Sequence, residues 1–226
     1  MSLVLSIFPG IGLFDRAFEQ EGFCIVRGPD LLWGGRIESF HPPAGKFDGV
    51  IGGPPCQAFS KLRYLNGFAG KQGNLIPEFE RVVMESAPSW FLMENVPDAP
   101  QPKTTGYAIT SIVLNNRWVG GEQHRTRRFS FGSVKCVPPL KTFIQWAALE
   151  QFNESGAVLA GHGPVGRSRL HIRVPSIQES NRLQGLPENF LSDAPFTVHG
   201  KRQMLGNGVP LPMGRAIARA VKQALT

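Results

Sequence analysis

The stretch Phe47-Asp48-Gly49-Val50-Ile51-Gly52-Gly53-Pro54-Pro55-Cys56-Gln57-Ala58-Phe59-Ser60 joins a short apolar run to a turn of glycines and prolines that holds one cysteine. The apolar run, residues 47–51, predicts a buried strand. Proline stiffens the backbone beyond it, so Cys56 is held at the carboxyl end of a strand, where it could act as a nucleophile. A lone cysteine beside a turn is more often a buried structural residue, and this stretch alone leaves both interpretations open.

A second stretch, Phe91-Leu92-Met93-Glu94-Asn95-Val96, is also an apolar strand, and it ends in a carboxylate. The alternation of strands and helices around these two stretches predicts an α/β fold with a mostly parallel sheet covered by helices on both faces. Ligands of such sheets bind outside the carboxyl ends of the strands. Cys56 and Glu94 both lie at such ends, which favours a catalytic role for the cysteine.

The other elements follow from hydrophobic periodicity. Strands are expected at residues 3–8, 23–26, 47–51, 90–93, 110–114 and 128–132, with a further strand ending at Arg36-Ile37. Helices are expected at residues 13–21, 76–86, 176–185 and 212–225. Between residues 134 and 173 the pattern dissolves into an irregular, glycine-rich and basic segment.

Composition limits the classes of function. The chain has 226 residues, which suits one domain, and its net charge of +7 suits a polyanionic partner such as nucleic acid. Its three cysteines, Cys24, Cys56 and Cys136, are widely spaced, which argues against a disulfide framework or a zinc site and for a reducing compartment. No apolar run is long enough for a membrane span, and the N-terminus lacks the features of a signal peptide.

Three further segments carry possible chemistry. Phe8-Pro9-Gly10-Ile11-Gly12 lies between a strand and a helix, where glycines let the backbone approach a cofactor, although an ordinary tight turn has the same composition. Asp30 follows the second strand and could hold a ribose or be a solvated loop residue. In residues 123–128 the arginines at i and i+2 share a face and could grip a phosphate or a polarised carbonyl, or form a basic surface edge.

Together and in this order, these segments resemble the DNA cytosine-5 methyltransferase family over residues 3–132 and 174–225. The matching motifs are the cofactor loop (residues 6–12), PCQxFS (55–60), ENV (94–96), QxRxR (Gln123, Arg125 and Arg127), a helix motif (178–187) and GNxV (206–209). The resemblance implies a Rossmann-like S-adenosylmethionine-dependent methyltransferase fold. It divides the chain into a catalytic and cofactor-binding part (1–133), a short target-recognition region (134–173) and a return to the catalytic domain (174–226).

The implied enzyme is a DNA (cytosine-5-)-methyltransferase that works on a cytosine flipped out of the duplex. Cys56 would attack carbon 6 as thiolate while a protonated Glu94 binds ring nitrogen 3. Arg125 would contact the exocyclic oxygen and help position Cys56, and Arg127 would support the loop or bind phosphate. The loop at residues 58–71 would close over the DNA.

The resemblance also assigns residues to the cofactor and to the DNA. S-adenosylmethionine would be bound by Phe8, Gly10, Ile11, Gly12, Asp30, Arg36, Ile37, Pro54, Leu75, Asn207 and Val209. Double-stranded DNA would be contacted by Gln57, Ser60, Lys61, Arg63, Arg167, Arg169 and Arg173. With a recognition region of this length, the expected site is a short one of about two to four base pairs, read by arginines that pair bidentately with guanine.

Three positions depart from the family pattern: Ser6 and Arg36 stand where aspartate is usual, and Leu13 where glycine is usual. The family's aspartate at position 36 accepts a hydrogen bond from the adenine amino group. Because a guanidinium only donates, Arg36 is expected to turn outward or to weaken or alter cofactor binding.

Two alternatives remain beside this interpretation: a non-catalytic relative that binds DNA, and an RNA cytosine-5 methyltransferase. The tRNA-methylating branch carries a CFT tripeptide that is not found here. A generic Rossmann-like oxidoreductase leaves PCQ, ENV and QxRxR unexplained. The expected protein is a monomer without membrane contact, acting in the cytoplasm of a bacterial or phage-infected cell, alone or in a restriction-modification system.

Overall fold

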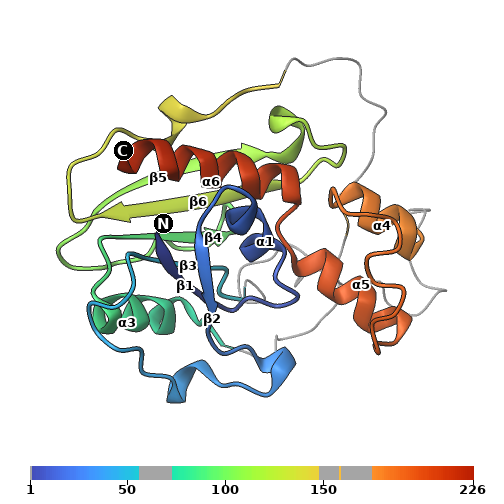
Figure 1. Cartoon of the computed structure of the whole chain (residues 1–226), viewed down its shortest axis with the longest axis horizontal. Helices are drawn as coiled ribbons and strands as arrows, with labels where there is room; N and C mark the ends of the chain where they lie inside the picture. The colour runs from blue at the N-terminus through green and yellow to red at the C-terminus, as the bar shows by residue number, and fades with distance from the viewer. Residues whose placement is uncertain (1, 56–72, 148–157, 159–174) are drawn as a thin grey trace.

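The computed structural model describes residues 2–55, 73–147, 158 and 175–226. Its centre is a six-stranded sheet with the order β2-β1-β3-β4-β6-β5 (Figure 1). The strands are β1 (Leu3–Ile7), β2 (Cys24–Arg27), β3 (Gly49–Gly52), β4 (Trp90–Asn95), β5 (Ala108–Asn115) and β6 (Thr126–Ser133). The first four run parallel, whereas β6 is antiparallel to both β4 and β5. The predicted mostly parallel sheet is thereby confirmed.

Helices cover both faces of this sheet, as predicted. The helices are α1 (Leu13–Gln20), α3 (Ile76–Ser86), α4 (Ile177–Leu183), α5 (Val198–Asn207) and α6 (Leu211–Leu225). Side chains alternate between the faces along a strand, so in β4 Trp90 and Leu92 pack with α1 and α6, while Phe91 and Met93 pack with α3. None of the helices in the described ranges is long and apolar enough to cross a membrane.

The helices α4 and α5 stand beside the sheet, beyond one edge, in the orange part of Figure 1. They enclose a smaller hydrophobic cluster of Leu183, Leu186, Leu191 and Leu205. Leu13 from the start of α1 and the isolated residue Val158 complete this cluster. The last third of the chain therefore contributes both this cluster and α6, which packs on the sheet.

The expected strand ending at Arg36-Ile37 is wrong, because this region forms two single-turn 3₁₀ helices, Leu31–Trp33 and Ile37–Ser39. The backbone carbonyls of this region need no neighbouring strand, because Arg81 of α3 binds them. Its guanidinium donates hydrogen bonds to the carbonyls of Ile37 (2.7 Å) and Phe40 (3.0 Å). A side chain thus binds the carbonyls that a neighbouring strand would otherwise bind.

Candidate active site

The carboxyl ends of β1, β3 and β4 meet at one edge of the sheet. Ile7 pairs with Gly52, and Gly52 pairs with Met93, so the next residues of the three strands lie side by side. A Cβ atom added to Gly53 would lie 3.0 Å from Oε2 of Glu94. The turn that leads to Cys56 therefore starts directly against this carboxylate, whereas Cys56 itself lies outside the described residues.

Glu94 is almost completely buried and has a cationic neighbour. Nε of Arg127, at the start of β6, lies 2.8 Å from its Oε1. The two groups form an ion pair by distance, yet Oε1 receives no well-aligned hydrogen bond. A buried acceptor without an aligned donor is costly and is characteristic of functional sites. Its hydrogen-bonding capacity is available to a group that enters the site.

The residue after Glu94 fixes the turn before the cysteine. Nδ2 of Asn95 donates a hydrogen bond to the carbonyl of Pro54 (3.2 Å), and its Oδ1 accepts one from the amide of Val96 (2.9 Å). Asn95 is buried, as is Pro54. This amide links the ends of β3 and β4, and so holds the start of the PCQ turn beside Glu94.

Arg125 and Arg127 have different partners, although the sequence puts them on one face of an extended segment. Arg125 is 3% exposed. Its guanidinium donates to two backbone carbonyls, those of Val158 (3.1 Å) and Gly206 (2.7 Å). Arg127 is the arginine that the structure places next to Glu94. The sequence-based expectation assigns Arg125 to the base and Arg127 to the loop or a phosphate. These contacts instead favour Arg127 as the arginine that faces the base.

The loop between β1 and α1 has an unusual backbone conformation, and hydrogen bonds from the segment after β2 stabilise it. Phe8, Gly10 and Gly12 all have positive φ angles, of 57°, 56° and 77°. The amide of Gly10 donates to Oδ2 of Asp30 (2.8 Å), and the indole of Trp33 donates to the carbonyl of Gly10 (2.9 Å). The segment after β2 therefore sets the position of this glycine loop.

Asp30 lies beside the loop, where the sequence places a candidate ribose ligand. Its carboxylate already has two structural partners, because Oδ1 accepts from the amide of Leu32 at 2.7 Å while Oδ2 binds Gly10. A carboxylate has about four acceptor positions, so a ribose hydroxyl could share it. The assignment of Asp30 to the ribose stays a prediction.

A buried polar network under the loop was not anticipated from the sequence. Asp15 of α1 is fully buried and accepts hydrogen bonds from Ser6 Oγ (2.5 Å) and from Arg27 Nε (2.8 Å). Gly12 has a φ of 77°, which other residues rarely adopt, and a Cβ there would also lie 2.9 Å from the guanidinium of Arg27, so glycine is favoured at this position. Burial raises the pKa of Asp15, while the hydrogen bond from Ser6 and the charge of Arg27 lower it, and burial is the largest effect.

This raised pKa predicts a pH-dependent effect of Asp15→Asn on stability. Because the folded-state pKa lies above the ordinary value of 3.8, wild-type folding takes up protons, and this contribution to stability is lost as pH rises through the raised pKa. Asparagine does not titrate, so the variant does not lose this stability. The difference in free energy of unfolding, variant minus wild type, should therefore increase as pH rises over this range. Urea unfolding at several pH values measures it, with the exposed Asp193→Asn as control; a constant difference would contradict the prediction.

Three apolar candidates for the cofactor site share one environment. Phe8, Ile37 and Leu75 pack against the same hydrophobic cluster on the α3 side of the sheet. A Cβ on Gly10 would meet no atom within 4 Å, so a ligand can approach the loop backbone. An open glycine loop, a neighbouring carboxylate and an apolar wall suit an adenosyl group, and the residues present fit S-adenosylmethionine.

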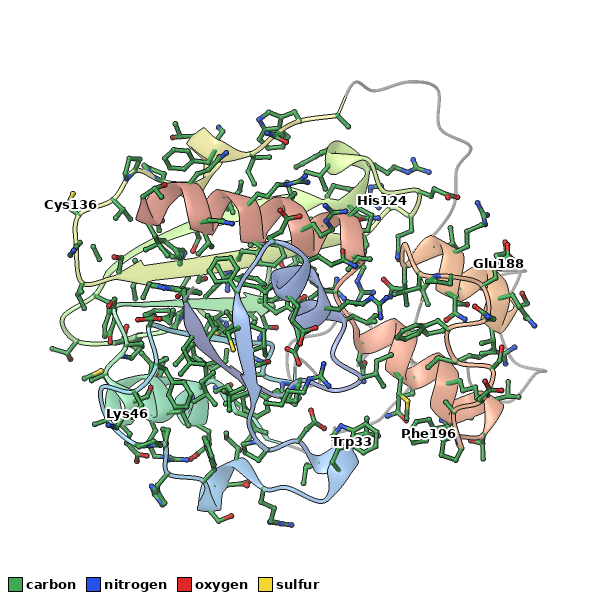
Figure 2. All side chains as sticks on the ribbon, in the orientation of Figure 1. Trp33, Lys46, His124, Cys136, Glu188 and Phe196 are labelled. Atoms are coloured by element: carbon green, nitrogen blue, oxygen red, sulfur yellow. The ribbon has the colours of Figure 1, made fainter. Side chains whose placement is uncertain are left out.

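The remaining cofactor candidates differ in their exposure. Pro54 is buried and Ile11 is half-buried, while Arg36 is exposed. At the junction of α5 and α6, Asn207 is exposed and Val209 is buried. Figure 2 shows Trp33 next to Phe196, and their ring centres lie 6.0 Å apart. This contact joins the segment after β2 to the segment before α5.

The residues proposed to contact DNA all lie outside the described residues, as does the loop at 58–71. They are Gln57, Ser60, Lys61, Arg63, Arg167, Arg169 and Arg173.

Comparisons with known proteins bear on the family and the fold of this chain. The sequence pattern of the C-5 cytosine-specific DNA methylases matches residues 36–143. The chain is similar to the Type II methyltransferase M.FnuDI of Fusobacterium nucleatum, with 30% identity over 99% of this chain and 95% of that protein. It is also similar to the Type II methyltransferase M.NgoPII of Neisseria gonorrhoeae, with 22% identity over 98% of this chain and 96% of that protein. Both alignments, over 327 and 329 positions, are longer than this chain, so both relatives carry insertions relative to it.

Solved structures share the fold. The Entamoeba histolytica methyltransferase EhMeth superimposes with a TM-score of 0.66 at 13% identity, covering 100% of this chain and 99% of that one. The likeness concerns the fold alone, and it confirms the predicted Rossmann-like methyltransferase architecture.

Proposed function

The chain belongs to the C-5 cytosine-specific DNA methylase family, and from this premise we propose that it methylates carbon 5 of cytosine through a covalent adduct with Cys56. It is a DNA cytosine methyltransferase, and the proposal concerns how its residues do the chemistry. The observation that carries it is the buried Glu94, which lies against the turn leading to Cys56 and beside Arg127. An acid, a cation and the approach to a thiol converge there.

Carbon 5 of cytosine is a poor nucleophile, and Cys56 changes that. Its thiolate forms a bond to carbon 6, and the electrons displaced from the ring double bond make carbon 5 nucleophilic. Splitting one difficult step into two easier ones is the advantage of covalent catalysis. Glu94, as a carboxylic acid, donates a hydrogen bond to ring nitrogen 3 and withdraws electrons from the ring while Cys56 adds.

Arg127, not Arg125, is the base-facing cation in this proposal. The guanidinium of Arg127 lies 2.8 Å from Glu94, whereas that of Arg125 is bound to two backbone carbonyls. A base entering between Glu94 and Arg127 takes over their contacts. Arg127 then donates to the exocyclic oxygen, and Glu94 faces ring nitrogen 3 in place of the guanidinium.

When bound, S-adenosylmethionine supplies the methyl group to carbon 5. The glycine loop at 10–12, Asp30 and the apolar wall around Phe8 would hold it. After the transfer, the proton on carbon 5 leaves to a base, the bond from carbon 6 to sulfur breaks, and Cys56 is restored.

The DNA is proposed to be double-stranded, with the target base flipped out. A base stacked inside a duplex cannot enter a site at the edge of this sheet, and extrusion costs about a few kcal/mol. The net charge of +7 favours binding to phosphates. The region at 134–173 is proposed to read a short site, and a monomer is sufficient for all these contacts.

Arg36 offers a test of the adenine pocket. Arg36→Asp should lower the dissociation constant of S-adenosylmethionine roughly tenfold, because a carboxylate can accept a hydrogen bond from the adenine amino group and a guanidinium cannot. Isothermal titration of both proteins measures the difference, with Glu38→Gln as a neighbouring charge control. Equal affinities of wild type and Arg36→Asp would show that position 36 does not contact the adenine.

The experiment that tests the function is covalent trapping on DNA containing 5-fluorocytosine. Fluorine cannot leave carbon 5 as a proton does, so the adduct should persist as a complex that resists denaturation and depends on S-adenosylmethionine. The same duplex with cytosine should instead be methylated and released. Trapping on 5-fluorocytosine RNA alone would favour the RNA methyltransferase. A folded protein that neither methylates nor forms the complex would indicate the non-catalytic relative.

A further inference from the structure

Val158 is held by two side chains of the QxRxR motif. Its amide donates a hydrogen bond to Oε1 of Gln123 (3.1 Å), and its carbonyl accepts one from Nη1 of Arg125 (3.1 Å). All three residues are buried, with exposed fractions of 0% for Gln123, 3% for Arg125 and 2% for Val158. Both backbone groups of one residue are thus satisfied by side chains two positions apart, an arrangement that replaces a strand partner.

The same two side chains bind the elements around Val158. Nε2 of Gln123 donates to the carbonyl of Leu183 (2.7 Å) and to Oε1 of Gln184 (3.1 Å). Arg125 also donates to the carbonyl of Gly206, near the end of α5. One short segment before β6 therefore holds the end of α4, the end of α5 and residue 158 in one place.

We infer that Gln123 and Arg125 form a clamp that positions the target-recognition region and do not touch the base. This rests on the proposed function, because residue 158 lies within the proposed recognition region at 134–173. Arg127 follows two residues after Arg125 and contacts Glu94. The clamp thus connects the region that reads DNA to the site that receives the base.

The clamp predicts a specific kinetic pattern. Gln123→Met keeps the side-chain volume but removes the acceptor for the Val158 amide and the amide group that donates to Leu183 and Gln184. The KM for DNA should rise about tenfold while kcat and the KM for S-adenosylmethionine change less than threefold, because a loosened recognition region weakens DNA binding and leaves the chemistry intact. Hydrogen exchange of the Val158 amide should accelerate in the same variant, since its acceptor is gone.

The matched control is Leu191→Ala. Leu191 lies in the hydrophobic cluster that also contains Val158, so this variant removes volume from the cluster but leaves the side chains of Gln123 and Arg125 intact. It should lower the unfolding temperature while leaving the KM for DNA unchanged. If Gln123→Met does not fold, Arg125→Lys tests the carbonyl side, because a single ammonium cannot replace both guanidinium bonds; it should also raise the KM.

An unchanged KM in the folded clamp variant, or an equal rise in Leu191→Ala, would overturn the inference. So would a loss confined to kcat, which would place these residues in the chemistry. The proposed function can fail separately: a wild-type protein that is not trapped on 5-fluorocytosine DNA contradicts the mechanism, whereas Val158 exchange still reports on the clamp.

Discussion

Cys56→Ser is expected to lower methyl transfer by roughly 10⁴-fold or more, because a hydroxyl is a far weaker nucleophile than a thiolate near neutral pH. The described residues before the cysteine support this expectation. The turn before it starts against the carboxylate of Glu94, and Asn95 holds the carbonyl of Pro54. The turn that leads to Cys56 is thereby held at the edge where the proposed base sits.

The matched control is Cys136→Ser, a second cysteine that is exposed and lies beyond the end of β6 (Figure 2). It should retain full activity and full trapping. Methyl transfer is measured with radiolabelled cofactor, and trapping with 5-fluorocytosine DNA. Residual activity of Cys56→Ser within tenfold of wild type would exclude a covalent mechanism through this residue. Binding of S-adenosylmethionine should be unchanged in both variants, which separates chemistry from folding.

The sheet and its active edge were predictable from the sequence. Strands such as β4 are continuous apolar runs, which is typical of parallel strands covered on both faces. Helix α3 begins and ends at the predicted residues, 76 and 86, because its buried positions follow helical spacing. The carboxyl-end rule for such sheets then placed the turn before Cys56 beside Glu94.

Helix α5 was not predicted, for a physical reason. Its buried residues are Met204, Leu205 and Gly206, all in the last turns, so no apolar stripe runs along it. The helix begins with a capping hydrogen bond from the amide of Gly200 to the hydroxyl of Thr197 (3.1 Å). A local cap and distant packing decide this helix, and neither gives a periodic signal.

The different partners of Arg125 and Arg127 also could not be predicted from the sequence, because they depend on contacts with residues far away in the chain. Spacing of two on an extended segment says that both side chains leave the same face, but not which partners they meet. Val158 and Gly206 lie far from Arg125 in sequence, and they bind its guanidinium. Asp15 and Arg27 are a similar case, since neither residue lies in a motif and only the fold brings them together.

Glu94→Gln and Arg127→Met should each lower kcat by about 10²- to 10³-fold. The glutamine cannot supply the proton that neutralises nitrogen 3, and the methionine removes the cation beside the developing charge. Arg125→Met should instead act mainly on the KM for DNA, through loss of the contact with Val158. Single-turnover rates at saturating DNA separate these effects, and His124→Ala, at the exposed residue directly before Arg125, is the control (Figure 2).

The double variant Glu94→Gln/Arg127→Met is the sharper measurement. Both residues are proposed to act on the same charge in the ring, and they contact each other at 2.8 Å. Removing the second should therefore cost much less than removing it from the wild type, so the combined loss should fall well short of the product of the single losses. A fully multiplicative loss would mean that the two groups act on separate steps. A larger single-turnover defect in Arg125→Met than in Arg127→Met would return the base-facing role to Arg125.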